Sequence, residues 1–237
     1  SAARQCCYCR IQLHFKCTLK YKGDAFAVKL QDILTGIDVL DIYNSNEIDI
    51  THITNNSREC REGSLFVAVR GFQTDGHKYI PMAVEKGAAA ILCEHEVENV
   101  PADVTVIVTE NNRKALAVVS ANFYGHPSRE MHAIGVTGTN GKTSTTYLMK
   151  SILDRVGGKV GIVGTIENRI GDKILKAERT TPESKELQAL FRQMKEEDVT
   201  DVVMEVSSHS LDLHRVDGIA FDVAIFTNLT QDHLDYH

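Results

Sequence analysis

The stretch that decides the fold is Ala133-Ile134-Gly135-Val136-Thr137-Gly138-Thr139-Asn140-Gly141-Lys142-Thr143-Ser144. An apolar run passes through three glycines into a segment with helical periodicity, which predicts a strand, a tight turn and the start of a helix. Such a turn directs several backbone N–H groups and the positive end of the helix dipole toward one point. A polyphosphate suits that point.

The residues of this turn are typical of a phosphate-binding loop. Gly138 and Gly141 let the backbone approach phosphates closely because neither has a Cβ atom. Lys142 can reach the β- and γ-phosphates, and the hydroxyl of Thr143 can bind Mg²⁺. The match to G-x-x-x-x-G-K-T is incomplete, because Val136 stands where the first glycine belongs. A glycine-rich turn with a surface lysine is the alternative, but the order strand, Gly-Lys-Thr, helix favours the phosphate loop.

The composition limits the possible classes of protein. The chain has 237 residues, 43% hydrophobic and 24% charged, which is ordinary for one large or two small globular domains. Its net charge of −6 argues against a nucleic-acid or membrane surface as partner. No apolar run approaches the roughly twenty residues that span a bilayer, and the N-terminal region lacks the apolar core of a signal peptide.

The six cysteines are unevenly placed. Four of them, at positions 6, 7, 9 and 17, crowd the N-terminus, whereas Cys60 and Cys93 stand alone. A disulfide framework would be spread through the fold, so we expect a reducing, cytoplasmic compartment. Residues 1–28 show no clear periodicity, and we interpret them as a disordered or non-native extension. A zinc knuckle opening with Cys6-x₂-Cys9-x₄-His14 is the alternative, although Cys17 then follows too early.

Beyond residue 50 the pattern alternates between strands and helices, which predicts an α/β fold with mostly parallel sheets. We expect an N-terminal domain over residues 29–110 and a central domain over residues 111–237. In the first, the predicted strands are 64–69, 88–93 and 104–108, and the predicted helix is 81–86. In the second, the predicted helices are 112–124, 143–156 and 183–197, the strands 159–163, 201–206 and 221–226, and a hairpin 167–175.

Polar residues follow several of these strands, at the edge where ligands of open α/β sheets collect. Glu205 ends one strand and can hold the Mg²⁺ of a nucleotide, or it can cap a helix. His233 follows the last strand in an acidic loop, where a metal role and a structural role are both open. Thr180 and Thr181 precede a helix and can bind an anion or cap that helix. Arg215 can clamp a carboxylate or phosphate, or it can be a surface charge.

Four motifs together resemble the Mur ligase family. In chain order they are G-V-T-G-T-N-G-K-T-S, T-T-P-E, M-E-V-S-S-H-S-L-D-L-H-R-V and N-L-T-Q-D-H-L-D-Y-H. The earlier stretch N-N-S-R-E-C-R-E-G-S-L-F-V-A-V-R-G-F-Q-T-D-G-H-K-Y-I is similar to the UDP-binding N-terminal domain of that family. The similarity runs from about Lys29 to the last residue and implies a UDP-binding domain followed by an ATP-binding phosphate-loop domain.

The resemblance implies an activity and its partners. The motifs are most similar to the members that add the third peptide residue of the peptidoglycan precursor. Such a ligase uses ATP and Mg²⁺ to join a diamino acid, meso-diaminopimelate or L-lysine, to UDP-N-acetylmuramoyl-L-Ala-D-Glu through an acyl phosphate. We expect a monomer.

The resemblance also assigns roles to individual residues. Lys142, Glu205 and His233 are the implied catalytic residues, and Thr143, Glu205 and His233 the implied Mg²⁺ ligands. The ATP phosphates would lie on Gly138, Thr139, Asn140, Gly141, Lys142, Thr143 and Ser144. The UDP end of the substrate would contact Asn55, Ser57, Phe72, Gln73 and Thr74. Its sugar-peptide end would contact Thr180, Thr181, Ser207 and Arg215.

The chain departs from the family pattern in three places. Asn56 stands where an aspartate is usual, and Leu213 stands where some members have a polar residue. The family's central domain continues with a metal-bridging lysine and then a C-terminal domain, whereas this chain ends at His237. We therefore expect a ligase fragment that does not turn over alone. A nucleotide-binding regulatory module is the alternative, and a simple phosphate-loop kinase or NTPase is disfavoured by the UDP-domain motif.

Overall fold

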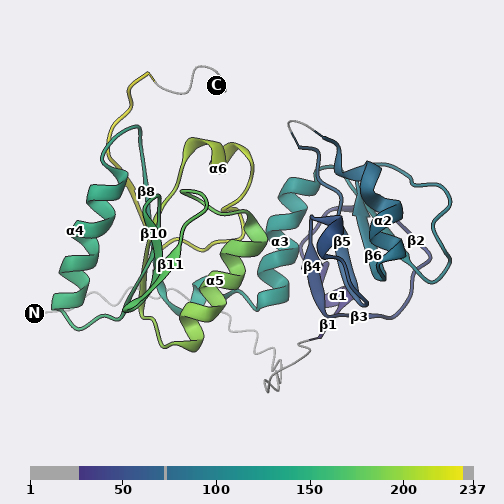
Figure 1. The fold of residues 1–237 in the computed structure, drawn as a ribbon, viewed down its shortest axis with the longest axis horizontal. Coiled ribbons are helices and arrows are strands. Elements are labelled where there is room, and N and C mark those ends of the chain that lie inside the picture. The colour runs from purple at the N-terminus through teal and green to yellow at the C-terminus, as the bar shows by residue number, and fades with distance from the viewer. Residues whose placement is uncertain (1–26, 72–73, 232–237) are drawn as a thin grey trace, which may run out of the picture.

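Two mixed sheets carry the two halves of the chain, and the structure, a computed structural model, describes residues 27–71 and 74–231 (Figure 1). Outside this part lie all of the expected N-terminal extension except Ala27 and Val28. Phe72 and Gln73 of the expected substrate loop, and His233, also lie outside it. Among the described residues, no helix combines the length and the apolar content needed to cross a bilayer.

The first sheet has five strands in the order β2-β7-β6-β5-β4. Four are parallel, and β2 joins the edge antiparallel to β7. Strands β5, β6 and β7 are almost completely buried, which explains their continuous apolar runs. The bounds are β2 (Val39–Tyr43), β4 (His52–Thr54), β5 (Ser64–Val67), β6 (Ala88–Cys93) and β7 (Thr105–Thr109).

Short helices and a two-stranded ribbon complete the first half. The ribbon pairs β1 (Val28–Lys29) with β3 (Asp49–Ile50), antiparallel. The helices are α1 (Leu30–Ile33), η1 (Ser57–Glu59), η2 (Gly76–Tyr79) and α2 (Ile80–Glu85).

Helix α3 (Asn112–Tyr124) lies between the two sheets (Figure 1). It begins where the Asn111 side chain accepts hydrogen bonds from two backbone N–H groups, and it ends at Gly125, whose φ is +74°. Its apolar residues pack into the core of the first sheet, and the helix also contacts α5 of the second half. The expected boundary between residues 110 and 111 therefore falls at the start of a helix that packs against both halves.

The second sheet has six strands in the order β11-β10-β9-β12-β8-β13. Strands β9, β12, β8 and β13 run parallel, and β10 and β11 form an antiparallel hairpin at one edge. The prediction of an α/β fold with mostly parallel sheets is confirmed. The bounds are β8 (His132–Thr137), β9 (Val160–Val163), β10 (Glu167–Ile170), β11 (Lys173–Lys176), β12 (Asp201–Glu205) and β13 (Val223–Phe226).

Helices cover both faces of this sheet. On one face α5 (Ser184–Glu196) buries Leu187 and Phe191 against Val202 of β12. On the other face α4 (Lys142–Arg155) packs Leu153 against Val203, the next residue of β12. Successive residues of β12 thus face opposite helix layers, as the strand period of two requires. The remaining helices of this half are η3 (Pro127–Glu130) and α6 (Ser208–Asp212).

Candidate functional site

The turn between β8 and α4 has the geometry of an anion site. Gly138 and Gly141 adopt φ values of +128° and +85°, a region that glycine enters without strain. Gly141 is the N-cap of α4, and no side chain caps that end of the helix. The first N–H groups of α4 have no partner within the helix, so they and the dipole favour an anion here. Ser144 lies exposed in this first turn.

Three residues expected to hold the ATP phosphates, Thr139, Asn140 and Lys142, donate hydrogen bonds to other protein groups. The backbone N–H groups of Thr139 and Asn140 donate to the backbone and side-chain oxygens of Asn228, at 3.0 Å each. Lys142 folds back, and its Nζ donates to the carbonyl oxygens of Gly138 at 2.6 Å and Thr139 at 3.1 Å. The N–H groups of Gly141 and of the first residues of α4 therefore remain to hold phosphate.

Glu205 lies directly beside this turn. It ends β12, opposite Val136 of β8, and only 2% of its surface is exposed. Both carboxylate oxygens accept from the Thr143 hydroxyl at 3.0 Å, and they also accept from the backbone N–H and hydroxyl of Thr165. A Cβ on Gly164 would lie 2.5 Å from Glu205 Oε1, so the carboxylate occupies space that only glycine leaves open.

These groups fit a magnesium ion held mainly by a nucleotide. A threonine hydroxyl and a carboxylate are oxygen ligands of the kind that Mg²⁺ prefers. The described residues contain no cluster of three or more His, Cys, Asp or Glu side chains that could hold a metal. Mg²⁺ usually takes one or two carboxylates and completes its shell with phosphate oxygens and water.

The residues expected at the sugar-peptide end are connected to Glu205 by hydrogen bonds. The Thr181 hydroxyl is buried, donates to the Glu205 backbone oxygen at 2.8 Å and accepts from the Ser207 backbone N–H at 3.2 Å. The Thr180 hydroxyl lies 3.0 Å from that of Thr165. Thr181 thus orients its neighbours, while Thr180 and Ser207 are only partly buried.

Arg215 bonds to Thr181 and also pairs with Glu183, an acidic residue for which the sequence predicted no role in the site. Its Nη1 donates to the Thr181 backbone oxygen at 3.2 Å, and its Nη2 lies 2.6 Å from Glu183 Oε1. The same carboxylate oxygen pairs with Arg179 at 2.7 Å. Arg215 Nε is buried and has no partner among the described residues. The i,i+4 spacing of Arg179 and Glu183 was a signal for their pairing, but nothing in the sequence indicated the pairing with Arg215.

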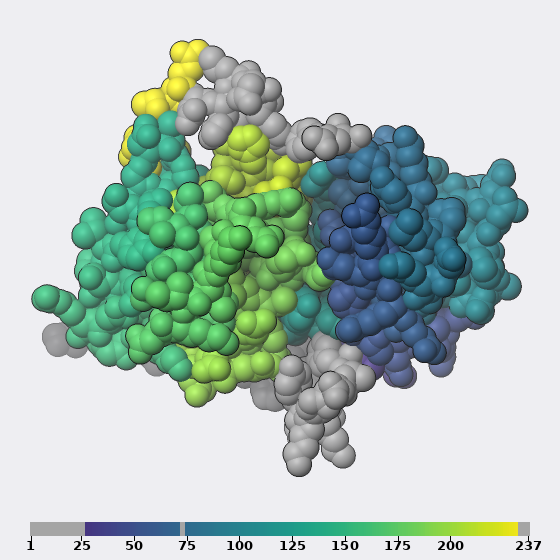
Figure 2. Space-filling view, viewed as in Figure 1, coloured from purple at the N-terminus to yellow at the C-terminus, as the bar shows by residue number. Residues whose placement is uncertain are grey.

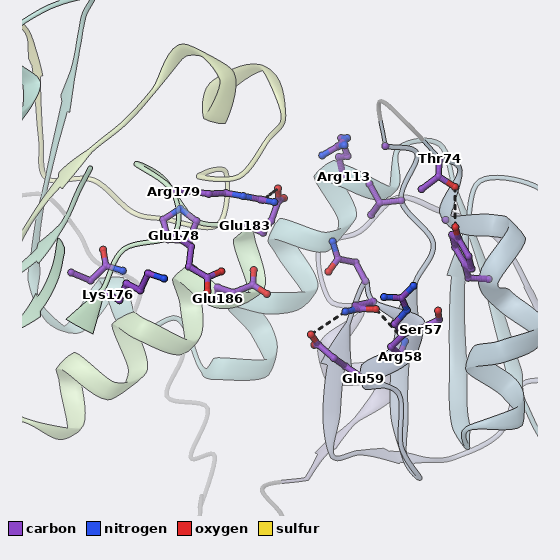
Figure 3. A pocket seen from close by; sticks show the side chains of 18 residues that line it. Ser57, Arg58, Glu59, Thr74, Arg113, Lys176, Glu178, Arg179, Glu183 and Glu186 are labelled. Atoms are coloured by element: carbon purple, nitrogen blue, oxygen red, sulfur yellow. Dashed lines mark hydrogen bonds and ion pairs between the residues drawn. The ribbon is translucent and has the colours of Figure 1, made fainter. Parts of the chain in front are cut away.

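A cavity of about 740 Å³ lies where the two halves meet, and its size suits a small-molecule ligand. Figure 2 shows the blue first half and the green second half in contact along a seam, and Figure 3 shows the side chains that line the cavity from both sides. The first half contributes three residues expected at the UDP end, Asn55, Ser57 and Thr74. The second half contributes Pro182 and Glu183, which directly follow Thr181 in the chain.

Charged side chains of both signs line this cavity. The basic ones are Arg58, Arg113, Lys176 and Arg179, and the acidic ones are Glu59, Glu178, Glu183 and Glu186. The protein around Glu186 removes water from its carboxyl and raises its pKa, and the nearby Glu183 and Glu59 act in the same direction. Guanidinium groups are suited to bind diphosphate or carboxylate.

Local hydrogen bonds hold the wall of the cavity that the first half of the chain forms. Asn56, the departure from the family pattern, caps η1 by accepting from the Arg58 backbone N–H at 3.1 Å. Its amide also donates to Glu59 Oε1 at 3.1 Å, which a carboxylate at this position could not do. Ser57 is buried beside Met82, and the Thr74 hydroxyl lies 3.2 Å from that of Tyr79. Asn56 therefore supports the same turn by an additional bond.

Comparisons with known proteins agree with this architecture. The Mur ligase family, catalytic domain, matches residues 49–124, and the Mur ligase middle domain matches residues 136–237. UDP-N-acetylmuramoyl-L-alanyl-D-glutamate–2,6-diaminopimelate ligase of Clostridium botulinum is 54% identical over 194 residues, which cover 81% of this chain and 40% of that protein. The enzyme of the same name from Clostridium tetani is 52% identical over 213 residues, covering 89% and 44%.

A solved structure of a UDP-N-acetylmuramoyl-L-alanyl-D-glutamate–2,6-diaminopimelate ligase has the same fold, with a TM-score of 0.71 at 23% identity over 90% of this chain and 42% of that one. The chain spans about two fifths of the length of the curated relatives it matches. Both domain matches occur in the order of the two sheets, and together they cover most of the residues described above. The chain therefore belongs to the Mur ligase family.

Proposed function

We propose that this chain carries the nucleotide-phosphate and UDP-substrate sites of an ATP-dependent ligase of peptidoglycan precursor synthesis. The reaction joins a diamino acid to the D-glutamyl carboxylate of UDP-N-acetylmuramoyl-L-Ala-D-Glu, in the cytoplasm. The observation that carries the proposal is the continuity between two sites. Glu205, which accepts from Thr143 of the phosphate turn, is linked through Thr181 and then Arg215 to Glu183, a residue of the cavity wall. Asn55 and Ser57 line the same cavity. The names of the relatives support 2,6-diaminopimelate over L-lysine.

The proposed chemistry has two steps. A D-glutamyl carboxylate oxygen attacks the γ-phosphorus of ATP, which yields an acyl phosphate and ADP. The amine of the diamino acid then attacks the acyl carbon, loses a proton, and expels inorganic phosphate as the amide bond forms. In the first step the N–H groups at the start of α4 and the Lys142 ammonium offset the negative charge on the transferring phosphoryl group, where such catalysis gains most.

The Mg²⁺ of the nucleotide would be held by Thr143 and Glu205, and it would supply positive charge beside the β- and γ-phosphates. Thr165 supports this arrangement because it donates two hydrogen bonds to the Glu205 carboxylate. The buried position of Glu205 keeps its carboxylate in one orientation. On the resemblance alone, His233 is a proposed ligand of a second Mg²⁺.

The substrate would extend along the cavity. Its uridine and diphosphate would lie on the wall formed by Asn55, Ser57 and Thr74, and Phe72 and Gln73 stay proposed contacts from the resemblance. Its sugar and peptide would reach toward Thr180, Ser207 and Arg215, beside the phosphate turn. Thr181 would act by orienting Ser207, because its own hydroxyl is buried and already bonded.

Calorimetric titration tests this function directly. The chain is titrated with UDP-N-acetylmuramoyl-L-Ala-D-Glu and with UDP alone, each with and without Mg²⁺-ATP. We expect the dipeptide substrate to bind more tightly than UDP, because only it reaches the second half of the cavity. Binding of neither, with a cooperative melting transition still present, would contradict the proposal and favour a nucleotide-binding regulatory module.

Turnover is a separate question, because the relatives are more than twice as long as the part they share with this chain. We propose that the 237 residues alone bind but do not complete the reaction. An assay for ADP release in the presence of the dipeptide substrate and diaminopimelate checks this. Steady release that requires both would contradict it.

A further inference from the structure

The segment Thr227–Thr230, which follows β13 and is called the brace here, runs beside the phosphate turn (Figure 1). We propose that Asn228 of this brace is a positioning residue that fixes the orientation of the peptide between Asn140 and Gly141, and thereby aims the Gly141 N–H at the nucleotide phosphates. The inference rests on the proposed ATP binding and adds a residue to which neither the motif nor the resemblance assigned a role.

The first observation is that Asn228 pairs with the backbone of Asn140 on both sides. Its Oδ1 accepts from the Asn140 N–H at 3.0 Å, and its Nδ2 donates to the Asn140 carbonyl oxygen at 3.0 Å. The backbone oxygen of Asn228 accepts from the Thr139 N–H at 3.0 Å. The side-chain amide therefore bonds to the turn as the backbone of a neighbouring strand would.

Further bonds make the brace and the turn complementary. The Thr227 hydroxyl donates to the Asn140 carbonyl oxygen at 2.7 Å. The Thr139 hydroxyl donates to the Thr230 carbonyl oxygen at 3.1 Å and accepts from the Thr230 N–H at 3.0 Å. A Cβ on Gly138 would lie 2.2 Å from Thr227 Oγ1. The turn can therefore approach the brace this closely only because residue 138 has no side chain.

The geometry of one peptide unit determines where the Gly141 N–H points. The carbonyl of Asn140 and the N–H of Gly141 belong to the same planar trans peptide, so they point in opposite directions. Two donors, Asn228 Nδ2 and Thr227 Oγ1, hold that carbonyl against the brace. The Gly141 N–H is therefore directed away from the brace.

Without these donors the peptide has an alternative. Glycine tolerates both signs of φ, so residue 141 offers little resistance to a flip of the preceding peptide. A flipped peptide would present the Asn140 carbonyl oxygen to the phosphates and turn the Gly141 N–H away. A partial negative charge would then replace a donor at the anion site, which weakens phosphate binding.

The test compares Asn228→Ala and Asn228→Asp with Leu229→Ala, a change in the adjacent residue whose side chain is 82% exposed. Titration with Mg²⁺-ATP is expected to show about a tenfold loss of affinity for Asn228→Ala, since two hydrogen bonds are lost. Asn228→Asp is expected to lose more, because it keeps the acceptor but places a carboxylate beside the Asn140 carbonyl. Leu229→Ala is expected to bind as the unaltered chain does.

Affinities for ligands with different numbers of phosphates separate a positioning effect from a general loss of stability. The loss is expected to be largest for ATP, smaller for ADP and absent for adenosine, with unchanged affinity for UDP in the cavity between the two halves and a melting temperature that falls by only a few degrees. Equal ATP affinity in Asn228→Ala, or parallel losses for ATP, UDP and melting temperature, would overturn the inference. Failure of the unaltered chain to bind Mg²⁺-ATP would instead overturn the proposed function.

A second variant keeps the test usable if Asn228→Ala does not fold. Thr227→Val keeps the shape of the side chain and removes its hydroxyl, which is the second donor to the Asn140 carbonyl at 2.7 Å and also lies 3.2 Å from the Thr137 carbonyl oxygen. We expect a smaller loss with the same dependence on phosphate number. In both variants the amide resonance of Gly141 in a nitrogen-15 spectrum is expected to shift, and an unmoved resonance would also contradict the inference.

Discussion

At the scale of single residues, the position of the Glu205 carboxylate depends on the absence of a side chain at Gly164. The Gly164 Cα faces Glu205 so closely that an added Cβ would lie 2.5 Å from Oε1. The φ of Gly164 lies outside the region that favours glycine, so the backbone itself accepts another residue. The glycine is therefore needed for the space it leaves and not for its flexibility.

We predict that Gly164→Ala weakens Mg²⁺-ATP binding by about tenfold and leaves UDP binding unchanged. The new methyl displaces the carboxylate from Thr143 and Thr165, which costs roughly one hydrogen bond's free energy and misplaces a metal ligand. Calorimetric titration with Mg²⁺-ATP and with UDP measures both. Unchanged ATP affinity would show that Glu205 is not part of the nucleotide site.

At the scale of secondary structure, the elements that were predicted best carry visible signals at both ends. The predictions of strand 88–93 and helix 112–124 are confirmed to the residue, and the helix is bounded by Asn111 and Gly125. Strand β2, Val39–Tyr43, was not predicted, because it is a half-exposed edge strand whose pattern depends on its partner β7. Strand β4 has only three residues, too few for a period to show.

The candidate site was predictable in part for a related reason. Glu205 and Lys142 stand at motif positions next to their own strands, so local sequence indicated them. Glu183 did not stand out, because its role depends on Arg215, which reaches it only through the packing of α6 and the loop that follows. Likewise, no periodicity reports that Asn228 bonds to Asn140. Local patterns predict elements, whereas pairings between distant segments follow from the tertiary structure.

We predict that Leu187→Ala in α5 destabilises the chain by about 3 kcal/mol, whereas Leu148→Ala in α4 changes stability by less than about 0.5 kcal/mol. The substitution is the same, but Leu187 is fully buried and Leu148 is 65% exposed. Urea unfolding of both variants measures the two free energies. Equal effects would mean that Leu148 is covered in solution by something that packs on α4.

At the scale of the whole molecule, the two halves are joined by specific contacts around the cavity. Lys185 of α5 pairs with Glu59 of η1 at 2.8 Å, and this hydrogen bond lowers the pKa of Glu59. Gln188 Nε2 donates to the Gly218 carbonyl oxygen at 2.9 Å, and a Cβ on Gly218 would lie 2.6 Å from a backbone oxygen of α3. This packing fixes the distance between the two walls that the substrate would bridge.

His52 of β4 makes this junction sensitive to acid. Burial lowers its pKa to about 4, and the positive charges of Lys185 and Arg61 act in the same direction, against a smaller opposite effect of Glu59. In the unfolded chain the pKa of a histidine is about 6.5, so the unfolded chain takes up this proton first as pH falls. His52 therefore contributes stability that is complete above pH 6.5 and is lost progressively toward pH 4.

We predict that the free energy of unfolding falls by at most about 3 kcal/mol between pH 6.5 and 4 through this group, and that His52→Gln removes that part of the decline. Urea unfolding at a series of pH values measures the decline. The difference between the variant and the unaltered chain separates the effect of His52 from that of His126, whose pKa is also lowered by burial.

Glu59→Gln is the matched control, because a carboxyl with a lowered pKa loses its contribution to stability only below its ordinary range near pH 4.5. Identical pH profiles of His52→Gln and the unaltered chain would mean that the two halves separate enough in solution to hydrate His52.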